Sequence, residues 1–135
     1  MLARSSYEQE YIDACRRQVD AQVAAFTTLA SSAPADTVAA FEPTYFNALV
    51  VYLEACFLHR TRAVEGKDGN PLNEVRVLTV SLTSGGGRMG TDRTMKLTPA
   101  TSVLGHAPGD EIAVRRDAFV RLADAFFADL EKRFR

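Results

Sequence analysis

The sequence lacks the residue clusters that metal sites and most catalytic sites require. Its two histidines lie 47 positions apart, and its two cysteines are isolated from each other, so they offer no local ligand pair. Helical proteins that hold two iron ions use a Glu-x-x-His motif, which is also missing. No nucleophile elbow and no catalytic cysteine signature is present. We therefore expect neither a metal nor a cofactor, and we leave open whether the protein is an enzyme.

The chain also lacks a strong charge of one sign and a long apolar run. Its 16 basic and 17 acidic residues give a formal net charge of -1, without a block of five like charges. This balance disfavours binding to nucleic acid or anionic lipid. The longest apolar run, 48–57, is too short for a membrane span and contains Glu54. The charged residues at 7–13 do not fit a signal peptide, so we expect a cytoplasmic protein without a membrane partner.

The sequence does contain enough apolar material for one ordinary core. Apolar residues make up 47% of the chain, and its length fits one unit, so we expect a single helical domain over 1–135. Both cysteines, Cys15 and Cys56, lie on apolar stripes of expected helices. Such positions suit buried, reduced thiols better than a disulfide framework.

Apolar residues recur at helical spacing in the first thirty positions. The steps are three and four residues long, and the polar Gln22 fills one gap. The apolar positions are Ile12, Cys15, Val19, Phe26 and Leu29. Ser5 or Ser6 fits the cap of this helix, and 31–34 ends it. The pattern predicts an amphipathic helix, followed by a short turn before Pro43 starts the next element.

A second helix is predicted over 43–64. It is apolar on nearly all sides between Tyr45 and Leu58, which indicates burial on more than one side. We therefore expect it to be the central helix of the domain. Gly66 provides its C-terminal stop, and Asp68-Gly69 fits a tight turn.

The next segment, 71–84, can be interpreted in two ways. Asn70-Pro71 is typical of a helix cap followed by the first helical position, and apolar residues follow on one face. The valines and threonines of 75–83 would also suit a strand. We favour a helix, because a strand does not need the start signal at Asn70.

The rest of the chain predicts an irregular segment and a final helix. The stretch 91–114 has no helical period, but 94–98 and 110–114 alternate and could pair across a turn at Pro108-Gly109. A broad apolar stripe then predicts a helix over 116–134. The expected fold is mainly α: an antiparallel bundle of three to four helices with a small β-hairpin or irregular segment before the C-terminal helix.

The glycines at 85–90 match the pattern G-x-G-x-x-G of dinucleotide-binding folds. That chemistry needs the glycines between a buried strand and a helix whose N-terminus faces the pyrophosphate. The residues that follow, 91–99, have no helical stripe. A phosphate loop is also disfavoured, because Gly90-Thr91 lacks the preceding lysine. We interpret the segment as a flexible loop.

Polar residues concentrate at the predicted end of the second helix and the turn after it. On a helix, His59 would continue an apolar stripe, with Arg62 three residues further and Glu65 three beyond. If the chain folds back at 66–69, residues of the next helix could face them. The hypothetical binding site consists of His59, Arg60, Arg62, Glu65, Asn70, Asn73, Glu74 and Arg76. A small anion could bind Arg62 or Arg60, with His59 exchanging a proton.

The same residues also have a purely structural interpretation, which we favour. Arg62 and Glu65 could form a solvated pair, His59 could be partly buried with a backbone partner, and the asparagines could cap helices. A connector rich in proline, asparagine and glycine needs many hydrogen-bond partners for its backbone. His106 is interpreted as an exposed loop residue.

Four stretches of the chain resemble small actinobacterial proteins of uncharacterised function: 65–76, 102–105, 109–112 and 125–134. The likeness covers about the last two thirds of the chain and implies a compact helical domain. That family carries no assigned activity or ligand, so the resemblance transfers no functional residue. An excess of arginine over lysine, 13 to 3, is typical of a GC-rich bacterial genome.

Two hypotheses for function follow. The first is a non-enzymatic cytoplasmic protein that acts by self-association or by binding a protein partner, with a homodimer expected. Its interface would use aromatic residues that exceed what one narrow seam can bury: Tyr7, Tyr11, Phe126, Phe127 and Phe134. The second is a small-ligand or anion site, possibly catalytic, at the end of the second helix.

Overall fold

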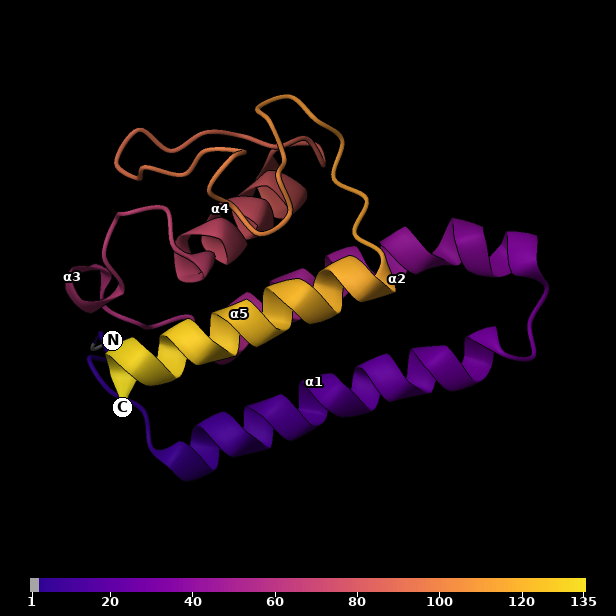
Figure 1. Ribbon diagram of the computed structural model, residues 1–135, viewed down its shortest axis with the longest axis horizontal. Coiled ribbons are helices and arrows are strands. Elements are labelled where there is room, and N and C mark those ends of the chain that lie inside the picture. The colour runs from indigo at the N-terminus through magenta and orange to yellow at the C-terminus, as the bar shows by residue number, and fades with distance from the viewer. Residues whose placement is uncertain (1–2) are drawn as a thin grey trace.

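The computed structural model describes residues 3–135, which contain five helices and no β-strand. The helices are α1 (Gln9–Ala30), α2 (Ala35–Cys56), α3 (Arg62–Glu65), α4 (Pro71–Ser84) and α5 (Arg116–Phe134). α1 runs antiparallel to both α2 and α5, and α4 lies above them with the segment that leads to α5 (Figure 1). The prediction of a mainly α fold is confirmed.

α1 forms because its apolar positions fall on one side. Ile12, Cys15, Val19 and Phe26 are the buried residues of this helix, as their spacing predicted, whereas Leu29, the last position of the predicted stripe, is 55% exposed. Its start differs from the prediction: Glu8 occupies the cap position without a side-chain hydrogen bond, and the helix begins at Gln9. The expected cap at Ser5 or Ser6 is therefore wrong. Those residues belong to the non-helical stretch that precedes the helix.

α2 begins eight residues earlier and ends eight residues earlier than predicted, so the expected helix over 43–64 is wrong at both ends. Pro43 lies inside α2, where it cannot donate a hydrogen bond to the carbonyl of Ala39, one turn back. The Arg115 guanidinium donates to that carbonyl instead, with Nη1 to O at 3.3 Å. The helix therefore continues through the proline, because a side chain distant in sequence replaces the missing donor.

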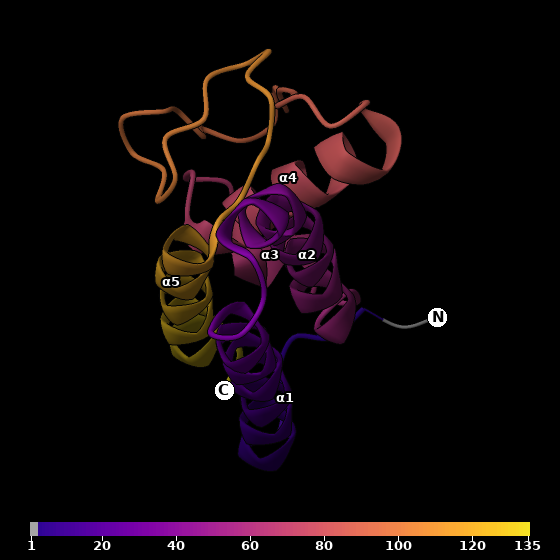
Figure 2. The ribbon, with the colours of Figure 1, turned by 90° about the vertical axis from the view of Figure 1, so that its right-hand side faces the viewer.

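α2 is the central helix, as predicted. It contacts α1, α4 and α5, and Figure 2 shows α2 between the other helices when the molecule is viewed along their length. Phe46 and Phe57 are fully buried, and they pack against Phe119 and Phe126 of α5 with ring centroids 5.5 and 5.8 Å apart. The core thus lies where α2 and α5 meet.

α4 is a helix, which resolves the ambiguity of 71–84 in favour of the start signal. The Asn70 side chain accepts a hydrogen bond from the Asn73 amide at 3.0 Å, and Pro71 takes the first helical position. The helix ends at Gly85, where an added Cβ would lie 2.8 Å from the Ser81 carbonyl oxygen. The glycine therefore permits a close turn of the backbone there.

The segment 85–115 is irregular, and the predicted alternative of a hairpin between 94–98 and 110–114 is wrong. The bridge in this segment joins Arg88 and Glu111 as an isolated antiparallel pair. The segment is nevertheless anchored: the Asn47 side chain of α2 donates to the Ile112 carbonyl at 2.9 Å and accepts from the Val114 amide at 3.0 Å. Among the residues described, no helix is long and apolar enough to cross a membrane.

Candidate functional site

Glu54 of α2, Arg60 and Glu65 of the connection that follows, and Arg76 of α4 form a buried ion-pair network, in which Glu54 is a member that the sequence analysis missed. The Arg60 guanidinium lies between two carboxylates, 2.9 Å from Glu54 Oε1 and 3.0 Å from Glu65 Oε1. Arg76 Nε donates to Glu65 Oε2 at 3.2 Å, and its Nη1 lies 3.8 Å from Glu54. The Arg60 and Glu65 side chains have no exposed surface. Two positive and two negative groups therefore neutralise one another away from water.

Arg60 also serves the backbone around it. Its guanidinium donates to the carbonyl oxygens of Phe57 at 3.2 Å and Leu72 at 3.0 Å, which joins the end of α2 to the first turn of α4. The same group lies over the ring of Phe126, 5.5 Å from its centroid, a favourable contact for a desolvated cation. Arg60 thus connects α2, α4 and α5 at one point.

The two carboxylates of the network have pKa values shifted in opposite directions. Burial by itself would raise the pKa of Glu65, but hydrogen bonds from Arg76 and the nearby charges of Arg60 and Arg76 outweigh it. The pKa of Glu65 therefore lies below its ordinary value of 4.5. Burial dominates at Glu54 and raises its pKa above 4.5, with Arg60 and Arg76 opposing that rise. The network holds Glu65 firmly as an anion and Glu54 less firmly.

The two asparagines of the predicted site join the turn to the network. Asn73 donates to Glu65 Oε2 at 2.8 Å, and its Oδ1 accepts from the Gly69 amide at 3.0 Å. Asn70 caps α4 and donates to the backbone carbonyl of Glu65 at 2.8 Å. The fold-back at 66–69 therefore brings Asn70, Asn73 and Arg76 to Glu65, as the sequence predicted.

Glu74 faces away from this group, although it is also buried. Its two carboxylate oxygens accept hydrogen bonds from the backbone amides of Val103 and Leu104, at 2.7 and 2.9 Å. Its role is therefore to hold the irregular segment 85–115 against α4. An anion in that place is well matched to two converging amide donors.

His59 and Arg62 are exposed and do not converge with the rest. His59 lies outside α2, because the helix ends at Cys56, so the predicted continuation of the apolar stripe to His59 is wrong. Arg62 lies 4.0 Å from Asp92 and not beside Glu65, so the expected pair of Arg62 with Glu65 is also wrong. The guanidinium groups of Arg60 and Arg76 are already paired with carboxylates. Ligand binding by the predicted site stays a prediction.

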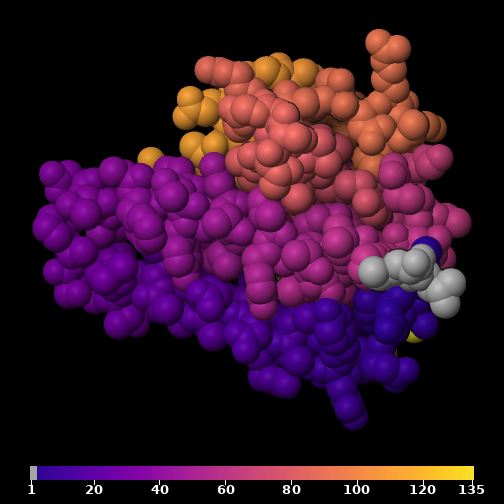
Figure 3. All heavy atoms as spheres, turned by 180° about the vertical axis from the view of Figure 1, so that it is seen from behind, coloured from indigo at the N-terminus to yellow at the C-terminus, as the bar shows by residue number. Residues whose placement is uncertain are grey.

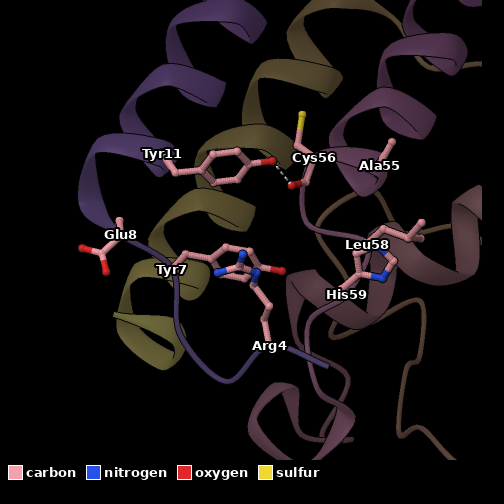
Figure 4. Close-up of a pocket in the computed structure, with 8 residues that line it drawn as sticks. All are labelled: Arg4, Tyr7, Glu8, Tyr11, Ala55, Cys56, Leu58 and His59. Atoms are coloured by element: carbon pink, nitrogen blue, oxygen red, sulfur yellow. Dashed lines mark hydrogen bonds between the residues drawn. The ribbon is translucent and has the colours of Figure 1, made fainter. Parts of the chain in front are cut away.

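A cavity of about 400 Å³, here called the end cavity, lies between the start of α1 and the end of α2. Figure 4 shows its lining, in which the Tyr11 hydroxyl donates to the Cys56 carbonyl at 2.5 Å. The Arg4 guanidinium lies 5.9 Å from the centre of the Tyr7 ring. Leu58 and Ala55 add exposed apolar surface at the edge. The end cavity is thus lined by polar and apolar surface in about equal parts, with the aromatic rings of Tyr7 and Tyr11 and the charged side chains of Arg4 and Glu8 in its wall.

The most extensive feature that the sequence analysis missed is an uncharged surface, here called the α1–α2 face. It consists of the exposed residues Tyr11, Gln18, Gln22, Ala25 and Leu29 of α1 and Phe41, Thr44, Ala48, Tyr52 and Ala55 of α2. Figure 3 shows the side of the molecule on which α1 and α2 lie next to each other. Steps of three, four and seven residues place each set on one side of its helix. These steps were visible in the sequence.

Charged side chains of α1 and α2 lie on other sides of these helices. Arg16 forms an ion pair with Asp124 of α5, on the opposite flank of α1. In α2, Glu42 accepts the backbone amide of Arg116 at 2.8 Å, and Glu54 belongs to the buried network. Tyr45 connects the two helices, because its hydroxyl lies within hydrogen-bond distance of the Gln22 backbone carbonyl and of Gln22 Oε1 and shares its one hydrogen between these two acceptors. The residues that make up the α1–α2 face are thus uncharged, and Arg16, Glu42 and Glu54 do not contribute to it.

The aromatic residues predicted to form an interface are mostly buried. Tyr7, Phe126, Phe127 and Phe134 belong to the core, so that part of the interface prediction is wrong. Tyr11 is 45% exposed and belongs to the α1–α2 face. Of the two cysteines, Cys15 is buried and Cys56 is partly buried, and both are free thiols. Among the described residues, no group of histidine, cysteine, aspartate and glutamate could hold a metal ion.

No protein-family model, no curated protein and no solved structure matches this chain. The geometry of the described residues therefore carries the functional argument alone.

Proposed function

We propose that the protein is a non-enzymatic binding protein that self-associates through the α1–α2 face. The observation that supports this is the absence of charge on a broad exposed surface of a chain in which 24% of residues are charged. Phe41, Tyr52 and Leu29 on this face are 41%, 40% and 55% exposed. Large apolar surfaces on a monomer are typical of interaction sites.

The size of the face fits a stable interface. α1 and α2 have 22 residues each. Two adjacent helices of that length cover a surface about 33 Å long and about 20 Å wide. Specific interfaces bury about 800 Å² on each partner, a comparable area.

A second copy suits this face better than a charged partner does. A charged partner surface would lose water without gaining an ion pair, because the face offers no opposite charge. Two copies of an uncharged face lose little on desolvation and gain the burial of apolar surface. A two-fold contact between identical faces also closes upon itself and ends at a dimer. The small-anion hypothesis has weaker support, because the candidate cations of the network are already neutralised.

Association should be tested by placing a charge at the centre of the face. Ala48→Glu would bury a carboxylate without a partner in the interface, and two copies would repel each other. We expect sedimentation equilibrium to show a dimer for the wild-type protein and a dissociation constant at least about 100-fold higher for the variant. Ala128→Glu, at an exposed alanine of α5, is the matched control and should leave association unchanged.

Two results would contradict the proposal. One is a wild-type protein whose mass stays that of a monomer at all concentrations. The other is equal association of Ala48→Glu and Ala128→Glu, which would place the contact on another surface.

A further inference from the structure

We propose that the two copies pair through antiparallel α2 helices, with Ala48 on the two-fold axis, and that the Phe41 ring of each copy enters the end cavity of the other. This inference rests on the proposed self-association and specifies its register. The two copies would then complete each other's surface, because each cavity would receive a side chain from the opposite end of the partner helix.

The sizes of the exposed residues of α2 support this register. In an antiparallel pair centred on Ala48, residues at equal distances on either side of it lie opposite each other. Phe41 then faces Ala55, seven residues away on each side, and Thr44 faces Tyr52, four residues away on each side. Each bulky residue meets a small one. At the centre two alanines meet, which lets the helix backbones approach closely.

The end cavity is in the right place for the Phe41 ring of a partner. Ala55 belongs both to the α1–α2 face and to the lining of the cavity. Seven residues along a helix span about 10 Å, so a ring that crosses Ala55 arrives at the mouth of the cavity. Tyr11 and Leu58 would contact its sides. Arg4, whose guanidinium lies over the Tyr7 ring, would contact the face of the second ring.

α2 is the better candidate for the central contact than α1. The middle of the face on α1 carries Gln18 and Gln22, and the Gln22 side chain is already hydrogen-bonded to the Tyr45 hydroxyl at 2.8 Å. Burying Gln18 against an apolar surface would leave its amide without partners. The exposed residues at the middle of α2, Thr44, Ala48 and Tyr52, carry no amide. α1 is therefore expected at the rim of the contact, where polar side chains keep water.

A cysteine at the axis tests the register directly. In Ala48→Cys the two thiols of a dimer would face each other, so mild oxidation should give a covalent dimer on non-reducing gels. The wild-type protein, which keeps Cys15 and Cys56, is the background control and should give none. Ala128→Cys, at an exposed position of α5, should not cross-link above the rate of random collision.

A tryptophan at position 41 tests the occupant of the cavity. The chain contains no tryptophan, so Phe41→Trp and the control Val120→Trp each have a single reporter. As dimer forms with rising concentration, the emission of Phe41→Trp should shift to the blue and resist quenching by acrylamide. Val120→Trp on α5 should change neither property, because that position lies outside the contact.

The possible outcomes separate the register from the proposed function. A wild-type protein that stays monomeric overturns both. A dimer that is sensitive to Ala48→Glu, but in which Ala48→Cys does not cross-link or the tryptophan at position 41 stays exposed, overturns the register alone. Cross-linking at position 48 together with protection at position 41 supports the antiparallel α2 pair with a filled cavity.

Discussion

The ion-pair network and the α1–α2 face distribute charge in opposite ways. The network places four charged side chains where water is nearly excluded, whereas the face places none where water is abundant. In the buried network, each charged side chain has a fixed partner, so the ion pairs hold the connection between α2 and α4 in one conformation. Outside, the lack of charge leaves a surface on which desolvation costs little. The ion-pair network therefore stabilises the fold, and the α1–α2 face is the surface that we propose for association.

Removing Arg60 should give the largest effect, because it leaves Glu54 and Glu65 buried without their shared cation. We expect Arg60→Met to lower the free energy of unfolding by about 3–5 kcal/mol. Urea denaturation followed by circular dichroism measures this. Arg62→Met, at an exposed arginine two positions further, should change stability by less than about 0.5 kcal/mol. Equal losses in the two variants would show that the network is not a structural element.

Glu65→Gln and Glu54→Gln should depend on pH in opposite senses. Folding lowers the pKa of Glu65, so ionised Glu65 stabilises the protein above pH 4.5 and loses that contribution as pH falls through its folded pKa. The advantage of wild type over Glu65→Gln, about 1.5–3 kcal/mol at neutral pH, should shrink on acidification.

Folding raises the pKa of Glu54, so the protonated form is favoured in the folded state. As pH falls through the raised pKa towards 4.5, wild type should become more stable relative to Glu54→Gln. Urea denaturation of the three proteins across this range measures both trends. Parallel slopes for the two variants would contradict the assignment of opposite shifts.

Glu74→Gln should have an intermediate effect and act on the irregular segment more than on the helices. The neutral amide keeps one acceptor oxygen, so one of the amides of Val103 and Leu104 loses its partner. A loss of about 1 kcal/mol is expected, with faster hydrogen exchange at these two amides. Glu111→Gln, at an exposed glutamate of the same segment, should leave their exchange unchanged. Unchanged hydrogen exchange at these amides in Glu74→Gln would contradict the role of Glu74 in holding the irregular segment.

Gln18→Lys should have the smallest effect on stability and a clear effect on association. Glutamine and lysine have similar helix propensity, so we expect a change of less than about 0.5 kcal/mol in unfolding. Two copies of the variant would bring lysines near each other at the rim of the contact. The dissociation constant should rise, and added salt should reduce the difference by screening. A salt-independent result would place Gln18 outside the interface.

The sequence predicted what depends on neighbours along the chain. The spacing of Ile12 and Val19 located α1, and the cap at Asn70 with Pro71 located α4 against a competing strand pattern. The end of α2 was missed, because apolar residues continue to Leu58 and periodicity does not show where a helix stops. The extension of α2 before Pro43 was missed as well. It depends on Arg115, which comes close only in the folded protein.

The sequence predicted most residues of the candidate site correctly, but it did not predict which of them form ion pairs with each other. The turn at 66–69 correctly indicated that Asn73 and Arg76 return to Glu65. Local spacing favoured Arg62 as the partner of Glu65, but Arg60 takes that place because it points inward from an extended stretch and not from a helix. The α1–α2 face was missed because alanine, glutamine and threonine occur on buried and exposed sides of helices alike, so their spacing does not mark a surface.

Both ends of the described chain are hydrogen-bonded close to the connection that follows α2. Arg4 exchanges backbone hydrogen bonds with His59 and Thr61, at 2.6 and 2.7 Å, and the Tyr7 amide donates to the Phe134 carbonyl at 2.7 Å. A circular permutant that joins residues near these two ends by a short linker, with the new ends at Gly86, where an added Cβ would meet no atom within 4 Å, should therefore keep these hydrogen bonds. Fluorescent labels at Arg4→Cys and Arg135→Cys would lie close together in each molecule, so their energy transfer would report on the packing of these two segments.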